Sequence, residues 1–299
     1  MPESSWFVET RGYLPDQDYS WQAAGAGGQD ARAAAELLAR GCRGRSVYEL
    51  IDDSASSLLL YCADGRSGGY GGAGPVWVLL ITGFRRAAED PTDHMGRTIR
   101  ASVLGTGTGH VPPEDLLAVA HRFLEGRLTG PLPVTYGLPD GTPGFEVDPE
   151  GWAGLLDEAR TELQDEPPPA ALINPDLVRV DRDTADTRSR AAAILREVDE
   201  QARAGVFDPA RAQLTGGTPR PLLVVTTLMR EDSLLALRPL HALSPYVDRR
   251  KESNVQREAG NSIVQGFFTK VAGTWGAVFA LAGLAGLALL AVAAVAVWR

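Results

Sequence analysis

The sequence has few of the residues that build disulfide frameworks or zinc sites. Among 299 residues there are two cysteines, Cys42 and Cys62, and four histidines. Two thiols do not make a disulfide framework. The histidines show neither the H-E-x-x-H pattern nor a zinc spacing linked to cysteine. We therefore expect reduced cysteines, no metal site and no cofactor.

Positive charge is also scarce. Lys and Arg together number 29 against 38 Asp and Glu, which gives a net charge of −9, and the only lysines are Lys251 and Lys270. Proteins that bind nucleic acid usually carry a basic surface or stripe. The charge balance therefore predicts that nucleic acid is not a partner.

Motifs for catalysis and phosphate binding are incomplete. The glycine run 105–109 follows an expected strand and precedes an expected helix, as an anion cradle would, but it lacks the Lys-Ser/Thr of a P-loop. A flexible connection is favoured there. Asp181, Asp183 and Asp186 are too few for a calcium cage, and their place at the start of an expected helix predicts capping. No G-x-S-x-G motif occurs, so no catalytic residue is assigned.

Long apolar runs are absent except near the C-terminal end. Residues 271–298 are a stretch of 28 positions without a charged side chain, whereas about 20 apolar helical residues cross a bilayer core of about 30 Å. Trp275 and Trp298 lie at its two ends, where indole rings favour the membrane interface. We expect one transmembrane helix that anchors the chain in a lipid bilayer by its tail.

The charges around this stretch predict its orientation. Residues 1–11 contain no basic segment followed by an apolar one, so no secretory signal is expected there. Several basic residues precede the stretch and only Arg299 follows it, which matches the positive-inside rule. The preceding ones are Arg249, Arg250, Lys251, Arg257 and Lys270. We expect a single-pass protein of the cytoplasmic membrane, with its N-terminus in the cytoplasm and its C-terminus outside.

Two features of this region leave alternatives open. Gly276 with Ala280, and Ala282 with Gly286, have the small-xxx-small spacing that lets a second helix approach closely. The helix is therefore either a plain anchor or a contact between copies of the chain. Within residues 246–270, apolar residues recur at every fourth position from 255 to 267, which fits an amphipathic helix at the lipid headgroups. The alternative is a flexible stalk.

The first half of the chain predicts an α+β domain over residues 1–165. Short apolar segments bounded by Gly, Asp, Ser or Pro are typical of strands. They are 6–10, 46–51, 57–62, 76–82 and 98–104. Because they are consecutive and short, we expect a mostly antiparallel sheet, with helix 30–40 covering one face. Apolar residues three and four apart predict further helices that begin near 112–115 and at 151.

Residues 166–245 predict a smaller α/β subdomain. A stiff linker of three prolines at 167–169 comes first. A strand (177–180), a charged amphipathic helix (184–204) and an apolar strand (222–227) follow, an order that suggests a small parallel unit. The expected fold class is α+β: an N-terminal mostly antiparallel sheet with covering helices, a smaller C-terminal α/β portion, and one C-terminal transmembrane helix.

Functional side chains are densest between residues 84 and 100. Gly96 can adopt the positive φ of a sharp turn, and Asp93 can hold Arg97 across it. Exposed guanidinium groups in this segment would suit a carboxylate or phosphate of a ligand or partner. The candidate contact residues are Arg85, Arg86, Asp93, His94, Arg97 and Arg100. The alternative is a solvated hairpin with salt bridges.

The run 93–102, DHMGRTIRAS, resembles the Gly-Arg step before a core strand in the GTPase-associated protein modules of bacterial conflict systems. The resemblance covers residues 1–130. It implies a non-enzymatic α+β module that works beside a GTPase or a similar switch, and it brings no catalytic residue to this sequence.

Together these patterns favour a membrane-anchored cytoplasmic sensor, adaptor or effector that acts through protein contacts in bacterial signalling or defence. One alternative is a membrane-tethered enzyme that acts on an anionic small molecule through the arginines around 85–100. The other is an effector whose membrane helix oligomerises and perturbs the bilayer. The last would be supported by a second membrane helix or a charged pore-lining residue, and the sequence predicts neither.

Overall fold

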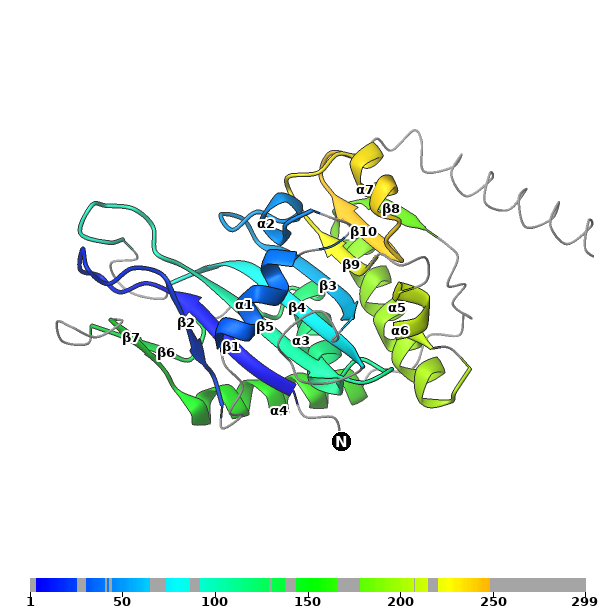
Figure 1. The fold of residues 1–299 in the computed structure, drawn as a ribbon, viewed down its shortest axis with the longest axis horizontal. Helices are drawn as coiled ribbons and strands as arrows, with labels where there is room; N and C mark the ends of the chain where they lie inside the picture. The colour runs from blue at the N-terminus through cyan, green and yellow to red at the C-terminus, as the bar shows by residue number, and fades with distance from the viewer. Residues whose placement is uncertain are drawn as a thin grey trace, which may run out of the picture. The chain divides into compact units, whose positions relative to one another are not determined.

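A mixed sheet of eight strands runs through the part of the chain that the computed structural model describes (Figure 1). The strand order is β2-β1-β5-β4-β3-β9-β10-β8. The strands are β1 Ser4–Thr10, β2 Ser20–Ala23, β3 Ser57–Asp64, β4 Pro75–Arg85, β5 Arg100–Thr108, β8 Arg179–Arg182, β9 Pro221–Val225 and β10 His241–Ser244. Neighbouring strands are antiparallel except that β10 is parallel to both β9 and β8.

The described residues belong to one compact unit, residues 1–249. They are 4–25, 31–40, 42, 45–64, 74–86, 92–128, 131–137, 144–165, 178–206, 208–214 and 220–247.

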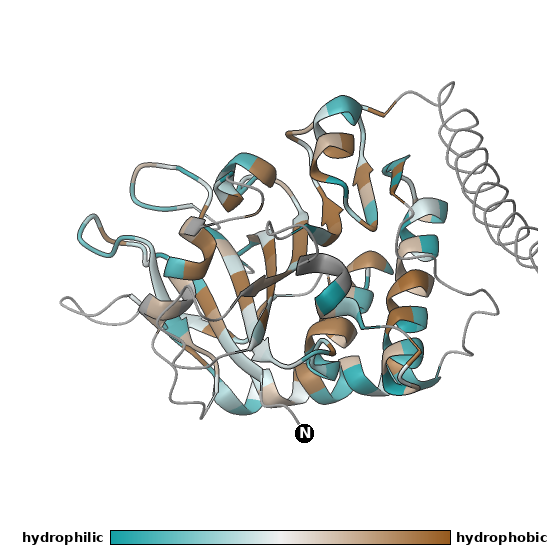
Figure 2. Ribbon diagram, turned by 45° about the vertical axis from the view of Figure 1, so that its right-hand side comes forward, coloured by the Kyte–Doolittle hydropathy of each residue, from teal (hydrophilic) through white to brown (hydrophobic). Residues whose placement is uncertain are grey.

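The central strands are apolar at successive positions because both faces of the sheet are covered. In β4, Trp77, Leu79 and Ile81 belong to one core, whereas Val78 and Leu80 belong to the other. Successive residues of a strand point to opposite faces, so a strand buried on both sides must be apolar throughout. Figure 2 shows this as brown, apolar positions along the central strands.

Helices cover the two faces in separate groups. Buried side chains of α3 Glu114–Leu124, α4 Pro149–Asp165, α5 Ala185–Arg203 and α6 Pro209–Leu214 line the first core. Those of α1 Ala31–Arg40, α2 Val47–Leu50 and α7 Glu231–Leu237 line the second. A small hairpin, β6 Val134–Tyr136 with β7 Phe145–Val147, forms a second sheet.

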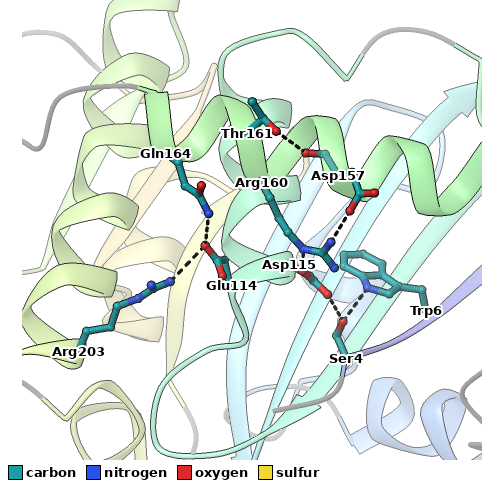
Figure 3. A network of polar contacts seen from close by, with 9 residues as sticks. All are labelled: Ser4, Trp6, Glu114, Asp115, Asp157, Arg160, Thr161, Gln164 and Arg203. Atoms are coloured by element: carbon teal, nitrogen blue, oxygen red, sulfur yellow. Dashed lines mark hydrogen bonds and ion pairs between the residues drawn. The ribbon is translucent and has the colours of Figure 1, made fainter. Parts of the chain in front are cut away.

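Hydrogen bonds and ion pairs of charged side chains connect α3 with α4 and with β1 (Figure 3). The Asp115 carboxylate accepts hydrogen bonds from Ser4 Oγ and Arg160 Nε, both at 2.5 Å. Glu114 Oε1 accepts one from Gln164 Nε2 at 3.0 Å. Both acids lie in the first turn of α3, where negative charge complements the helix dipole. These carboxylates are paired within the protein, and the network connects β1, α3 and α4.

The predicted fold class is wrong in its division of the sheet. The two strands expected in the α/β portion are present as β8 and β9, and β10, which was not expected, lies between them. All three belong to the same sheet as the N-terminal strands. Residues 58–60 of β3 pair antiparallel with residues 223–225 of β9 and join the two parts. The physical reason is that β9 is buried at all five positions, so it needs a neighbouring strand on each edge and a helix layer on each face.

The helices predicted from apolar spacing are present as α1, α3, α4 and α5. The segment 46–51, expected as a strand, instead contains α2. Its buried residues Val47, Leu50 and Ile51 recur at spacings of three and four, which is the helical period.

No helix within the described residues is long and apolar enough to cross a membrane. The transmembrane helix expected at 271–298, with Trp275 and Trp298 at its ends, lies outside the described residues, as does the stalk beyond Val247. The fold class is therefore corrected to α+β with one large mixed sheet and helices on both of its faces, without a membrane helix in the described part.

Candidate functional site

Between β4 and β5 lies a tight turn, residues 92–98, which we call the Asp93 turn. Asp93 N donates to Arg97 O and Gly96 N donates to Asp93 O, both at 2.8 Å. Gly96 has a φ of +74°, and no described atom lies within 4 Å of the position that a Cβ would take. Glycine is therefore favoured here by the backbone conformation and not by lack of space. The sharp turn expected at Gly96 is present.

The carboxylate of Asp93 is the centre of this turn. Its Oδ1 accepts hydrogen bonds from the N–H groups of Met95 and Arg97, both at 2.9 Å. Its Oδ2 accepts one from Arg97 Nε at 2.9 Å, with Arg97 Nη2 at 2.8 Å and Arg11 Nη1 at 3.2 Å. The Asp93 side chain is 1% exposed. A buried carboxylate is tolerated when it is paired and hydrogen-bonded, and both oxygens meet that condition.

These contacts favour the ionised form of Asp93. Burial by itself raises the pKa of the carboxyl group. The hydrogen bonds from the backbone and side chain of Arg97 and from Met95 N–H, together with the charge of Arg97, outweigh burial and lower the pKa to about 2. Asp93 is therefore charged at neutral pH and keeps the turn closed.

Sequence reasoning missed Arg11, the second cation on Asp93. Arg11 follows β1 directly, its side chain is 8% exposed, and its guanidinium carbon lies 5.8 Å from the centre of the Tyr19 ring. In the sequence, 93 − 11 = 82 positions separate it from Asp93. No local spacing could have shown that these two side chains meet.

The loop that contains Arg11, residues 11–19, packs against the Asp93 turn. Tyr13 O accepts a hydrogen bond from His94 N at 3.3 Å, and His94 Nδ1 lies 3.2 Å from the same oxygen. Because a carbonyl oxygen can only accept, we assign the proton of this ring contact to Nδ1. Figure 1 shows the two loops side by side beyond the ends of their strands.

Exposed side chains of the two loops gather into what we call the tip surface. Its members are Tyr13, Tyr19, His94, Met95 and Arg97. Met95 is 68% exposed, Tyr13 40% and Tyr19 45%, and the side chain of Arg97 is 63% exposed. Two aromatic rings, a thioether and a guanidinium group thus face solvent above a buried ion pair.

The other predicted contact residues have different neighbours. The guanidinium carbon of Arg86 lies 4.4 Å from the centre of the Tyr136 ring, a cation–π contact. Arg86 Nε and Nη1 are buried without a hydrogen-bond partner among the described residues. Arg85 is exposed and lies opposite Arg100 where β4 ends and β5 begins. The six predicted residues therefore do not form one site: only three of them belong to the Asp93 turn.

A second group of ionisable side chains was not expected from the sequence. It comprises Glu9, Tyr48, Asp52, Asp53 and Arg100. Burial and the negative charge of Asp53 raise the pKa of Glu9 to about 7. The pKa of Asp52 is lowered, chiefly by hydrogen bonding to Ser54, with a contribution from the charge of Arg100. Glu9 is therefore a carboxyl group whose charged form destabilises the fold.

The glycine run 105–109 is neither a phosphate cradle nor a flexible connection, because Gly105 and Gly107 lie within β5. A Cβ on Gly105 would lie 2.7 Å from the ring of Trp6, and one on Gly107 would lie 2.3 Å from Pro113 Cγ. These glycines make room for the side chains packed on the strand.

Of the three aspartates expected to cap α5, Asp186 lies in the first turn, where its charge complements the helix dipole, but none of the three is the N-cap residue. Thr184 is the N-cap and its hydroxyl forms a capping box. Asp183 instead pairs with Arg188 at 2.6 and 2.8 Å, and Asp181 lies 2.9 Å from His241 Nε2. Among the described residues, no group of three or more His, Cys, Asp or Glu side chains is placed to hold a metal ion.

Known proteins give no further assignment: no protein-family model, curated protein or solved structure matches the chain. The resemblance of residues 93–102 to GTPase-associated modules therefore stays a prediction. The tip surface and the buried ion pair beneath it are the features that a functional proposal can use.

Proposed function

We propose that the chain is a protein-binding module, a sensor or adaptor, that contacts its partner through the tip surface. The observation that carries the proposal is the exposure of Tyr13, Met95 and Arg97 on loops fixed by a buried carboxylate. Tyr, Met and Arg are enriched at protein interfaces, and Tyr and Arg are also enriched among the residues that dominate binding energy.

The Asp93 turn also lowers the cost of binding. Ordering a flexible side chain at an interface costs about 0.5 to 1.5 kcal/mol. Arg97 is already held by its Nε and Nη2 contacts to Asp93, and the backbone at Met95 is fixed by its own bond to Oδ1. A partner therefore meets a surface that is ordered before binding. On the resemblance alone, we propose a GTPase or similar switch as the class of partner.

Site-specific photo-crosslinking tests the proposal. A photo-reactive amino acid at position 95 is expected to crosslink the chain to one discrete protein in the native host. The control is the same amino acid at position 206, because Val206 is 69% exposed, close to the 68% of Met95, and lies outside the tip surface. Equal products from both positions, or none from position 95, would contradict the proposal.

We also propose that the uncharged segment 271–298 attaches this module to the cytoplasmic membrane. The support is the sequence itself: 28 positions without charge, preceded by basic residues. After an alkaline carbonate wash, most of the full chain is expected in the membrane pellet, whereas residues 1–249 alone should be in the supernatant. Release of the full chain by carbonate would show that the segment does not anchor it.

A further inference from the structure

Among the side chains that pair at Asp93, positive charge exceeds negative charge. Two guanidinium groups, those of Arg11 and Arg97, share the single carboxylate of Asp93, so the three side chains carry a net charge of +2 − 1 = +1. Asp93 accepts from two backbone N–H groups as well, so its oxygens are occupied.

Arg97 is the member that a partner can reach. Its side chain is 63% exposed, against 8% for Arg11. Its Nε and Nη2 point to Asp93, and its Nη1 has no partner among the described residues. The free edge of a planar guanidinium group suits a carboxylate, whose oxygens accept charge-assisted hydrogen bonds.

The charged residues near Arg97 determine which kind of anion can bind there. Asp16 and Asp18 are exposed in the 11–19 loop beside the tip surface, and they would repel a polyanion such as a nucleic acid or an anionic bilayer. A single carboxylate at Arg97 avoids most of that repulsion. Met95 and Tyr13 are exposed nearby, so an apolar side chain of the same partner can be buried there.

We infer that the tip surface recognises a protein segment in which an Asp or Glu side chain stands next to a large apolar one. The carboxylate binds the free edge of Arg97, and the apolar side chain packs on Met95 and Tyr13. This inference rests on the proposed function, because it names the chemistry of the partner at the same surface.

A display library of random peptides, selected on the full chain, tests this chemistry. The selected peptides are expected to carry Asp or Glu beside an aromatic or large aliphatic residue. Arg97→Ala should weaken the binding of the strongest such peptide about 30-fold. Arg97→Lys, which keeps the charge but loses the planar fork, should bind with intermediate affinity.

Arg203→Ala is the matched control. Arg203 also pairs with an aspartate four residues earlier, at 2.8 Å from its Nε, and its side chain is 54% exposed, but it lies on α5. Its removal should leave the peptide affinity unchanged. The melting temperature of each variant shows whether a loss of binding reflects a loss of fold. If Arg97→Ala does not fold, the peptide affinity of Arg97→Lys is compared with that of the native chain instead.

Two outcomes separate the inference from the proposed function. Selected peptides that lose affinity with Met95→Ala or Tyr13→Ala, but show no preference for acids and bind Arg97→Ala normally, would overturn the acidic segment and leave the tip surface as the contact. Peptides whose binding is unaffected by all three substitutions would overturn both.

Discussion

Replacing Glu9 by Gln is expected to stabilise the fold by about 3 kcal/mol at pH 8 and to leave its stability nearly unchanged at about pH 4. The pKa of Glu9 is raised from 4.5 to about 7 by burial and by the charge of Asp53. The fold therefore favours the protonated carboxyl group. Its contribution to stability is complete below pH 4.5 and is lost as the pH rises through about 7. Glutamine resembles the protonated form and cannot lose a proton.

Urea unfolding of residues 1–249 at the two pH values measures this effect. Glu146→Gln is the control, because Glu146 is exposed on β7 and the substitution removes the same charge. The control is expected to change the free energy of unfolding by less than about 0.5 kcal/mol at either pH. If Glu9→Gln behaves like Glu146→Gln at pH 8, Glu9 is not held in a destabilising environment.

Replacing Asp93 by Asn is expected to open the turn and to abolish crosslinking from position 95. The amide group of Asn would place N–H donors against the donors of Arg97 and Arg11, and the buried guanidinium group of Arg11 would lose its only ion-pair partner among the described residues. The melting temperature should fall clearly, whereas Asp16→Asn, in the exposed part of the 11–19 loop, should leave it nearly unchanged.

The pH dependence of Asp93→Asn provides a second check. The folded pKa of Asp93 is about 2, below its ordinary value of 3.8. Its stabilising contribution is therefore complete above about pH 4 and is lost as the pH falls towards 2. The stability difference between the native chain and Asp93→Asn should shrink over that range. A difference that is constant from pH 5 to about 2 would mean that the charge of Asp93 is not what holds the turn.

Features that depend on near neighbours in the chain were predicted well. Helix α5 was expected over 184–204 and spans Ala185–Arg203. The turn at Gly96 and the contact of Arg97 with Asp93 were both expected, and both are present. In each case the interacting residues are within a few positions of each other, so periodicity or spacing contains the information.

Features that depend on pairing across the chain were missed. Leu60 of β3 pairs with Leu223 of β9, 223 − 60 = 163 positions away. Both segments have the composition of buried strands, but an apolar segment does not indicate which other strand lies beside it in the sheet. The contact of Arg11 with Asp93 was missed for the same reason, so only one of the two cations that pair with Asp93 was predicted.

The sequence also could not show which polar groups are buried or which side chains pack against them. Glu9 lies in β1, and the sequence of this strand gives no reason to expect a raised pKa, because the shift comes from burial and from the charge of Asp53. The glycines of 105–109 were read as a flexible connection because the chain alone does not show that Trp6 and Pro113 pack against them.

Amide hydrogen exchange of the chain bound to the protein captured at position 95 tests the central claim most directly. We expect exchange to slow on binding at the amides of the 11–19 loop and of the Asp93 turn, because the partner covers them, with little change in the rest of residues 4–247. Unchanged exchange in these two loops together with slowing elsewhere in the sheet or helices would contradict the claim that the tip surface is the protein-binding surface.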